Sequence, residues 1–235
     1  SNWEFGTSLV QTSDGGYALL GDTSSFGAGM DDLWLVKTDS YGNQMWTRPY
    51  GGPNDERTSH ANCLVQTIDG GYAFVGSTES FGAGNRDIWL VKTNIAGYME
   101  WSRPFGTTED EEAHSVIQTS DNGYAIVGYT GDLATDTDMY MIKTDVSGNK
   151  LWDKTYNISA LDFAVDVLEI TDGYMLAGSI IGDVWLAKLD IFGNVVWNRT
   201  YEGGVASTII ETPDGGYAMT GYTYTTNHDF DFSLT

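Results

Sequence analysis

Carboxylate side chains are the groups in this sequence with the most capacity for chemistry. The 235 residues include 33 Asp and Glu against 11 Lys and Arg, which gives a formal net charge of −22 at pH 7. Most of these acids recur at fixed positions of a repeat. The others gather in three segments that contain Asp55, Glu56, Asp110, Glu111, Glu112, Asp162 and Asp166. Clustered carboxylates can coordinate a hard cation such as Ca²⁺, and a suitably spaced pair can hydrolyse a sugar linkage.

The charge also limits what the protein can bind. A surface with this excess of negative charge repels phosphate backbones, so we expect no nucleic-acid partner. No apolar segment approaches the length needed to cross a bilayer, so we expect no membrane insertion. We predict no organic cofactor, because the glycine-rich segment at 26–29 lacks the helix that a phosphate-binding loop needs. Ca²⁺ is the one ion that we consider, although no Asp-x-Asp-x-Asp-Gly loop occurs.

The histidines and the single cysteine suggest no catalytic constellation. His60, His114 and His228 could in principle ligate zinc, but they occupy different repeat positions, and we expect them to be solvated loop residues. No motif joins them to a Ser or Cys nucleophile. Cys63 has no partner cysteine within the chain, and we expect it to be a small buried apolar residue. We therefore assign no catalytic residue.

A repeat organises the whole chain. An Asp-Gly-Gly-Tyr segment, exact or altered, recurs five times at intervals of 43 to 55 residues, with its Tyr at Tyr17, Tyr72, Tyr124, Tyr174 and Tyr217. A Leu-Val-Gln-Thr segment or a variant of it lies upstream of each Tyr. A Trp-Leu-Val-Lys-Thr-Asp segment lies downstream, first at 34–39, and a second Trp follows it. Internal repetition of this length indicates a propeller or a solenoid.

Each repeat predicts four short strands, which lie near 9–12, 16–21, 32–38 and 44–50 in the first copy. Asp-Gly-Gly is a hairpin signal, and the second strand is apolar at both parities, which indicates a sheet that is covered on both faces. We predict an all-β, five-bladed β-propeller of four-stranded antiparallel blades. It would form one domain over 1–235, with repeats at approximately 4–50, 51–105, 106–156, 157–201, and 202–235 plus 1–3.

The repeats resemble those of the SBBP-like β-propeller proteins that bacteria and archaea secrete. The shared pattern is a Gly-Gly pair, an acidic turn, Asp-Gly-Gly-Tyr and Trp-Leu-Val-Lys-Thr-Asp, and it covers the whole chain. This resemblance implies the propeller fold, and we expect an extracellular or cell-surface location. It implies no ligand and no activity.

We expect the N-terminal strand to close the ring. Residues 1–3 align with the Trp-bearing fourth strand of the other copies, and the fifth copy stops after its third strand. An N-terminal strand that completes the last blade would hide an exposed edge, and Trp3 would then be buried. The alternative is an open segment of a longer array.

Eight of the 11 basic residues recur at two repeat positions, and we interpret both sets as structural ion pairs. Lys37, Lys92, Lys143 and Lys188 end the third strand, where we expect each to pair with the Asp of its own Asp-Gly-Gly turn. Arg48, Arg103, Lys154 and Arg199 follow the fourth-strand Trp, and we expect them near the Asp that begins the third strand.

The non-recurrent acids precede the innermost strands, so they should surround one mouth of the central channel. Loops that contain Phe26 and Phe81 share this face. Three interpretations of the mouth compete: a solvated acidic surface, a divalent-cation site, and a glycosidase with Asp166, Glu169 and Glu211 on the inner strands. Gln11, Gln66 and Gln118 occupy the equivalent position in the other repeats, which favours a structural role for Glu169 and Glu211.

From these observations we predict a non-enzymatic binding or scaffold module. It would bind a glycan or a protein ligand through the mouth residues Asp55, Glu56, Asp110, Glu111, Glu112, Asp162, Asp166, Phe26 and Phe81. We expect a monomer or a part of a larger multidomain chain. The alternative is a secreted glycan-active hydrolase with carboxylates on the inner strands.

Overall fold

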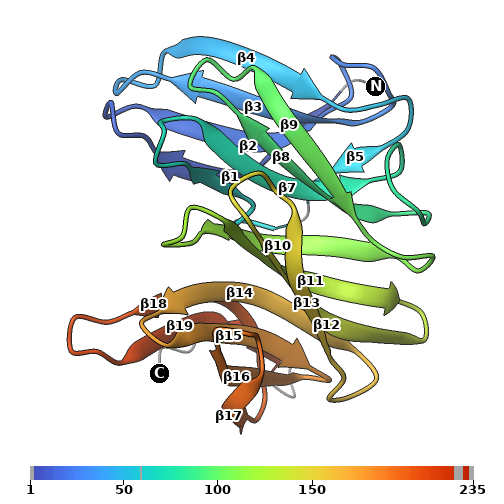
Figure 1. The fold of residues 1–235 in the computed structure, drawn as a ribbon, viewed down its shortest axis with the longest axis vertical. Helices are drawn as coiled ribbons and strands as arrows, with labels where there is room; N and C mark the ends of the chain where they lie inside the picture. Colours follow the sequence, from blue (N-terminus) through green and yellow to red (C-terminus); the bar gives the residue numbers. More distant parts are fainter. Residues whose placement is uncertain (1–2, 59, 225–229, 233–235) are drawn as a thin grey trace.

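The protein is built from β-strands. A computed structural model describes residues 3–58, 60–224 and 230–232, in which every regular element is a strand. The strands form five antiparallel sheets that follow one another in chain order, from the blue end to the red end of Figure 1. None of the described residues forms a helix that could span a membrane. The expected all-β, propeller-like architecture is therefore confirmed.

Each sheet takes its strands from one stretch of the chain. Sheet 1 consists of β1 (Glu4–Gln11), β2 (Tyr17–Thr23), β3 (Asp32–Thr38) and β4 (Gln44–Tyr50). Sheet 2 consists of β5 (Glu56–Arg57), β6 (Leu64–Gln66), β7 (Tyr72–Thr78), β8 (Asp87–Thr93) and β9 (Met99–Phe105). Sheet 3 consists of β10 (Glu111–Gln118), β11 (Tyr124–Asp132), β12 (Asp136–Thr144) and β13 (Lys150–Tyr156). Sheet 4 consists of β14 (Asp162–Ile170), β15 (Gly173–Ile180), β16 (Asp183–Asp190) and β17 (Val195–Tyr201). Sheet 5 consists of β18 (Val205–Glu211), β19 (Tyr217–Tyr224) and β20 (Phe230–Phe232).

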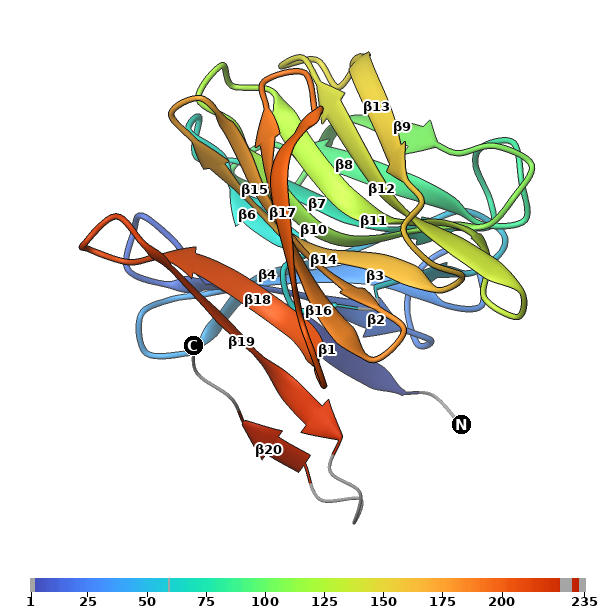
Figure 2. The ribbon, with the colours of Figure 1, turned by 90° about the horizontal axis from the view of Figure 1, so that it is seen from below.

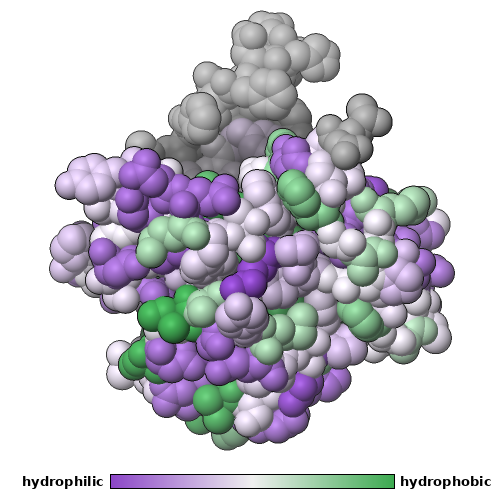
Figure 3. All heavy atoms as spheres, turned by 90° about the horizontal axis from the view of Figure 1, so that it is seen from above, coloured by the Kyte–Doolittle hydropathy of each residue, from purple (hydrophilic) through white to green (hydrophobic). Residues whose placement is uncertain are grey.

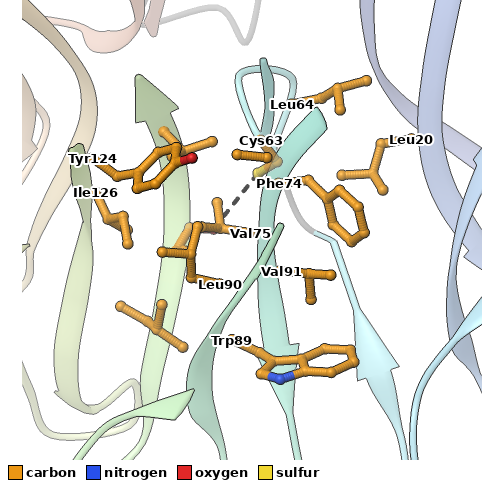
Figure 4. Close-up of a cluster of buried hydrophobic side chains, with 14 of the residues drawn as sticks. Leu20, Cys63, Leu64, Phe74, Val75, Trp89, Leu90, Val91, Tyr124 and Ile126 are labelled. Carbon is orange, nitrogen blue, oxygen red and sulfur yellow. Dashed lines mark hydrogen bonds between the residues drawn. The ribbon is translucent and has the colours of Figure 1, made fainter. Parts of the chain in front are cut away.

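The core lies between neighbouring sheets. Every residue of β7 and β8 is buried, which confirms that the middle strands are covered on both faces. Figure 4 shows Phe74, Val75, Leu90 and Trp89 of these strands in the cluster that joins sheets 1 to 3. Two further clusters join sheet 3 to sheet 4 and sheet 4 to sheet 5. Burial of apolar area at these successive contacts is the main force that holds the series together.

The predicted lysine pairs with the turns are confirmed. Lys37, Lys92, Lys143 and Lys188 lie 2.7–2.9 Å from the turn carboxylates of Asp14, Asp69, Asp121 and Asp172. In the first three the ammonium also donates to the carbonyl of the next residue, and the Lys side chain is buried while its Asp partner stays exposed. Each lysine therefore joins the end of a third strand to the hairpin of its own sheet.

The second set of basic residues differs from its prediction. The guanidinium of Arg48 lies 5.8 Å from the ring centre of Trp46 and 3.7 Å from that of Tyr98, and it donates to the carbonyl of Ala96. Residues two apart on a strand face the same side, so each arginine lies over the indole that precedes it. In register, Arg48 pairs with Leu35, well away from the start of β3. Arg48, Arg103 and Arg199 are therefore cation–π partners of the preceding indole, whereas Lys154 donates to Asn194 Oδ1 at 3.2 Å. Neither kind of contact involves the third-strand Asp.

Two polar and aromatic contacts repeat from sheet to sheet. The fourth-strand indoles of Trp46 and Trp101 each meet the edge of a Tyr of the next sheet, with ring centres 5.8 Å apart. Gln66, Gln118 and Glu169 accept hydrogen bonds from the backbone of the preceding sheet's turn, at Ser13, Ile68 and Ser120. Glu169 therefore occupies the structural polar slot that the repeat predicted.

Trp3 does not take part in the closing strand that was predicted for it. Its carbonyl accepts from the N–H of Ser24, which directly follows β2, and its own N–H donates to the Ser24 hydroxyl, so Trp3 extends the inner strand of its own sheet. Its side chain is 41% exposed. Residues 1–2 of the predicted strand lie outside the described residues. Sheet 5 has β20 as its outermost strand (Figure 2), and none of the buried core clusters of the described residues joins sheet 5 to sheet 1. Over the residues that the structure describes, the ring is therefore open between sheets 5 and 1.

Candidate functional site

A bulge recurs in the inner strands and places side chains at one cavity. The pairing register shifts at His114 in β10, at Val165 in β14 and at Ser207 in β18. A bulge leaves one residue outside the ladder and re-aims its side chain. All three residues line a single cavity. The repeat therefore places one variable residue of each of these inner strands at the same cavity.

Sheet 2 carries an insertion where the other inner strands have the bulge. Ten positions separate Glu56 from Gln66, whereas seven separate Glu111 from Gln118, so sheet 2 has three additional residues. They split its inner strand into β5 and β6, which both pair with β7. The inserted segment takes His60, Ala61 and Asn62 to the cavity.

The cavity has a volume of about 720 Å³ and lies among the inner strands of sheets 2 to 5. Apolar side chains dominate its walls, among them Leu133, Leu161, Phe163 and Ile181. A space of this size, apolar with a few polar groups, is typical of a small-molecule or cofactor site. On the side of the molecule that Figure 3 shows, by contrast, hydrophobic side chains lie in small groups among hydrophilic ones.

Three polar groups converge on one wall of this cavity. One ligand-capable atom from each of His60, Glu112 and His114 lies within 4.8 Å of the other two. The rings of His60 and His114 have centres 3.6 Å apart, and Glu112 Oε1 lies 3.9 Å from His114 Nε2. Glu112 is 9% exposed and His114 is 3% exposed, so these two side chains are largely removed from bulk solvent, whereas His60 is half-buried.

Neighbouring groups hold Glu112 and His114 in place. The Nδ1 of His114 lies 2.9 Å from the carbonyl oxygen of Ala164, which can only accept, so Nδ1 bears the hydrogen and Nε2 keeps its lone pair. The Tyr129 hydroxyl donates to Glu112 Oε2 at 3.2 Å, and Arg86 approaches the same oxygen at 3.4 Å. Oε1 thus faces the histidines while Oε2 is anchored.

Burial sets the protonation of these side chains. It lowers the pKa of His114 well below its usual value, and the nearby His60 lowers it further. Burial also lowers the pKa of His60, which Glu112 partly offsets. The pKa of the Tyr129 phenol is raised by burial and by the Glu112 carboxylate. Both imidazoles are therefore neutral near pH 7, and Tyr129 keeps its proton.

Most of the predicted mouth acids accept hydrogen bonds that hold the structure together. Glu56, Glu111 and Asp162 are completely buried. Each accepts hydrogen bonds from backbone N–H groups of the loop before its strand, at Gly52, Thr107, and Ile158 with Ser159. Their side chains hold the connections between sheets.

The other predicted residues are also outside the cavity, except Glu112. Asp166 accepts hydrogen bonds from Ser115, Thr208, and the N–H groups of Val167 and Ile209, and so joins three inner strands. Asp55 pairs with Arg57 at 2.9 Å, and Asp110 does not line the cavity. Phe26 and Phe81 lie beside the indoles of Trp34 and Trp89.

Sequence reasoning missed His60 and His114 as site residues. His114 was expected in a solvated loop, but it is a buried bulge residue of β10. An alignment of the inner strands could have identified both. In that alignment His60 falls in the insertion of sheet 2, and His114 lies two positions after Glu112, an acid that does not recur in the other repeats. His228 lies outside the described residues.

Comparison with solved structures shows the fold. A protein from Bifidobacterium bifidum s17 assigned as an exo-beta-1,3-galactanase matches with a TM-score of 0.55 and 14% identity, over 97% of this chain and 89% of that chain. An endo-arabinase from Bacteroides thetaiotaomicron VPI-5482 matches with a TM-score of 0.53 and 9% identity, over 100% and 94%. A protein from Bacteroides fragilis NCTC 9343 assigned as a 6-phosphogluconolactonase matches with a TM-score of 0.55 and 12% identity, over 97% and 70%.

These neighbours correct the predicted function. No protein-family model and no curated protein matches the sequence. Two of the three structural neighbours bear the names of enzymes that act on glycans. They favour the glycan-active hydrolase over the non-enzymatic binding module that the sequence analysis placed first. The likeness itself shows the fold alone, at 9% and 14% identity.

Proposed function

We propose that this protein is a glycan-active hydrolase and that the cavity among the inner strands of sheets 2 to 5 is its substrate site. The single observation that carries the proposal is the convergence of Glu112, His60 and His114 on one wall of a 720 Å³ cavity. The glycan-acting names of two neighbours with the same fold support the substrate class.

The walls of the cavity suit a sugar ring. Tyr129 and Phe163 both line it, with ring centres 5.4 Å apart and planes nearly perpendicular. Aromatic faces cover the apolar C–H side of a ligand, while a few polar groups fix its orientation. Asn62, from the segment between β5 and β6, and Ser207 of β18 supply an amide and a hydroxyl group to the lining of the cavity.

Glu112 is the one carboxylate among the described lining residues, and this shapes the proposed chemistry. The usual glycosidase pair uses two carboxylates, one as acid and one as base or nucleophile. Here the cluster of Glu112, His60 and His114 would take a proton from the attacking water and return it to the oxygen of the leaving sugar, so that hydrolysis balances with a single carboxylate. The inner-strand acids of the original alternative, Asp166 and Glu169, are bound into structural hydrogen bonds instead.

We further propose that the five sheets are the blades of one five-bladed propeller, of which the fifth is incomplete over the described residues. A hydrolase of polymeric glycans meets its substrate outside the cell, so we propose an extracellular or cell-surface location.

Release of sugar from arabinan and from β-1,3-galactan oligosaccharides tests the proposal. We expect activity in the unmodified chain and a loss of about 100-fold or more in Glu112→Gln, since removal of an acid–base group costs two to four orders of magnitude. Glu109→Gln is the matched control, because Glu109 is an exposed carboxylate three residues away that does not line the cavity. Equal activity in both variants would exclude Glu112 from the reaction.

A further inference from the structure

We propose that His60, Glu112 and His114 form a binding site for one divalent transition-metal ion of the Zn²⁺ type. The ion would bind there whether or not the cavity cleaves a glycan. Three lone-pair donors, from two different sheets, meet at this place within 4.8 Å of one another.

The approach of His114 and Glu112 is unfavourable unless a cation lies between them. Nδ1 of His114 donates to Ala164, so the Nε2 that faces Glu112 Oε1 is an acceptor, and so is the carboxylate. Two acceptors 3.9 Å apart in a buried site repel each other weakly and form no hydrogen bond. A metal ion placed between them turns this unfavourable pair into two coordinate bonds.

The spacing suits a small ion. Ligand atoms around tetrahedral Zn²⁺ lie about 2.1 Å from the metal and so about 3.4 Å from each other. The separation of 3.9 Å between Nε2 and Oε1 would need to close by about half an ångström. His60 belongs to the inserted segment between β5 and β6, and movement of this segment could adjust its ring without disturbing a strand.

The hydrogen-bond partners of His114 and Glu112 are of the kinds that orient ligands in known metal sites. A ligating histidine usually donates its other N–H to a carbonyl or a carboxylate, as His114 does to Ala164. A ligating carboxylate is usually held by a further hydrogen bond, as Glu112 is by Tyr129.

The ligand set selects the metal. Two imidazole nitrogens and one carboxylate suit Zn²⁺ and its neighbours in the first transition row, whereas Ca²⁺ prefers oxygen ligands and more of them. Three protein ligands with the fourth position open to a cavity are the arrangement of a catalytic zinc and not of a structural one. Such an ion would bind a water molecule and lower its pKa toward neutrality.

Competition for Zn²⁺ against a chromophoric chelator tests the site in the full chain after removal of bound metal. We expect one Zn²⁺ per chain and an affinity loss of at least about tenfold in His60→Gln, His114→Gln and Glu112→Gln. Glu109→Gln should bind as the unmodified chain does. X-ray absorption should show nitrogen and oxygen ligands at about 2.0–2.2 Å, with imidazole scattering.

Two results would overturn the inference: no stoichiometric Zn²⁺ binding, or binding that survives in all three variants. His60→Gln is the variant least able to disturb folding, because His60 is half-buried in a connection, and circular dichroism checks all three. Stoichiometric binding without glycan hydrolysis would overturn the proposed function alone. Hydrolysis by a chain that binds no Zn²⁺ would overturn this inference alone.

Discussion

The imidazole rings of His60 and His114 lie with their centres 3.6 Å apart, although one belongs to an insertion in sheet 2 and the other to a bulge in sheet 3. Two protonated rings at this distance would repel strongly, and His114 is removed from water that could screen the charge. The pair is therefore stable only while the rings are neutral or share a cation.

Acid should destabilise the fold through His114. Its folded pKa lies well below the value of about 6.5 in an unfolded chain, because burial and then His60 disfavour the charged ring. Below about pH 6.5 the unfolded state binds the proton and the folded state does not, so the free energy of unfolding falls as the pH decreases. Urea denaturation from about pH 8 to about pH 5.5 should show this slope, and His114→Gln should reduce it. An identical slope in the variant would contradict the assignment.

Loss of Lys92 should change the ionisation of Asp69. Burial alone would raise the pKa of Asp69, but hydrogen bonds from Lys92 and Thr67 outweigh it and lower the pKa to about 2. In Lys92→Met we expect the pKa of Asp69 to move toward 3.8, though not fully, since Thr67 and Gly71 still donate. Carbon-detected NMR titration measures it. Asp121, with its own partner Lys143, is the internal control and should stay at about 2.

Gly51 is required by the packing of two buried carboxylates. A Cβ at this position would lie 1.9 Å from Asp32 Oδ1 and 2.4 Å from Glu56 Oε2. We expect Gly51→Ala to lower the free energy of unfolding by about 2 kcal/mol or more, because both acids are buried and cannot move freely. Gly6→Ala is the control of opposite sign: no atom lies within 4 Å of its Cβ, so the change should be neutral or stabilise by up to about 1 kcal/mol. Equal losses in the two variants would refute the argument for Gly51.

Trp3 should contribute little to stability. Its indole is 41% exposed, and its backbone pairs with Ser24 of its own sheet. We expect Trp3→Ala to cost less than about 1 kcal/mol, whereas Trp89→Ala, at a position 1% exposed in the core of sheets 1 to 3, should cost about 3–5 kcal/mol. Thermal or urea unfolding compares the two. A loss from Trp3→Ala as large as that from Trp89→Ala would restore the closed ring that the repeat first suggested.

Local repeat signals predicted the sheets well, because turn chemistry and burial act over a few residues. Asp-Gly-Gly turns need a left-handed glycine such as Gly15, and the lysine that ends each third strand lies beside its turn by register. The closing strand was not predictable in this way. It depends on whether the backbone of Trp3 finds a better partner than Ser24, and a local sequence pattern cannot compare partners that lie far apart in the chain.

The candidate site was hidden for a related reason. Most acids that looked free in sequence, such as Glu111 and Asp162, fold back onto their own loops, and only the structure shows these hydrogen bonds. The site arises where the repeat is broken, at the bulge of His114 and the insertion of His60. A search for recurring motifs overlooks such positions, because they differ from one repeat to the next.

The most direct test of the proposed function is a crystal structure of Glu112→Gln soaked with an arabinan or galactan oligosaccharide. We predict a sugar ring in the cavity, against Phe163 and Tyr129, with a glycosidic oxygen within about 3 Å of the residue 112 side chain. An oligosaccharide bound elsewhere, with this cavity free of sugar under the same soak, would contradict the assignment of the site.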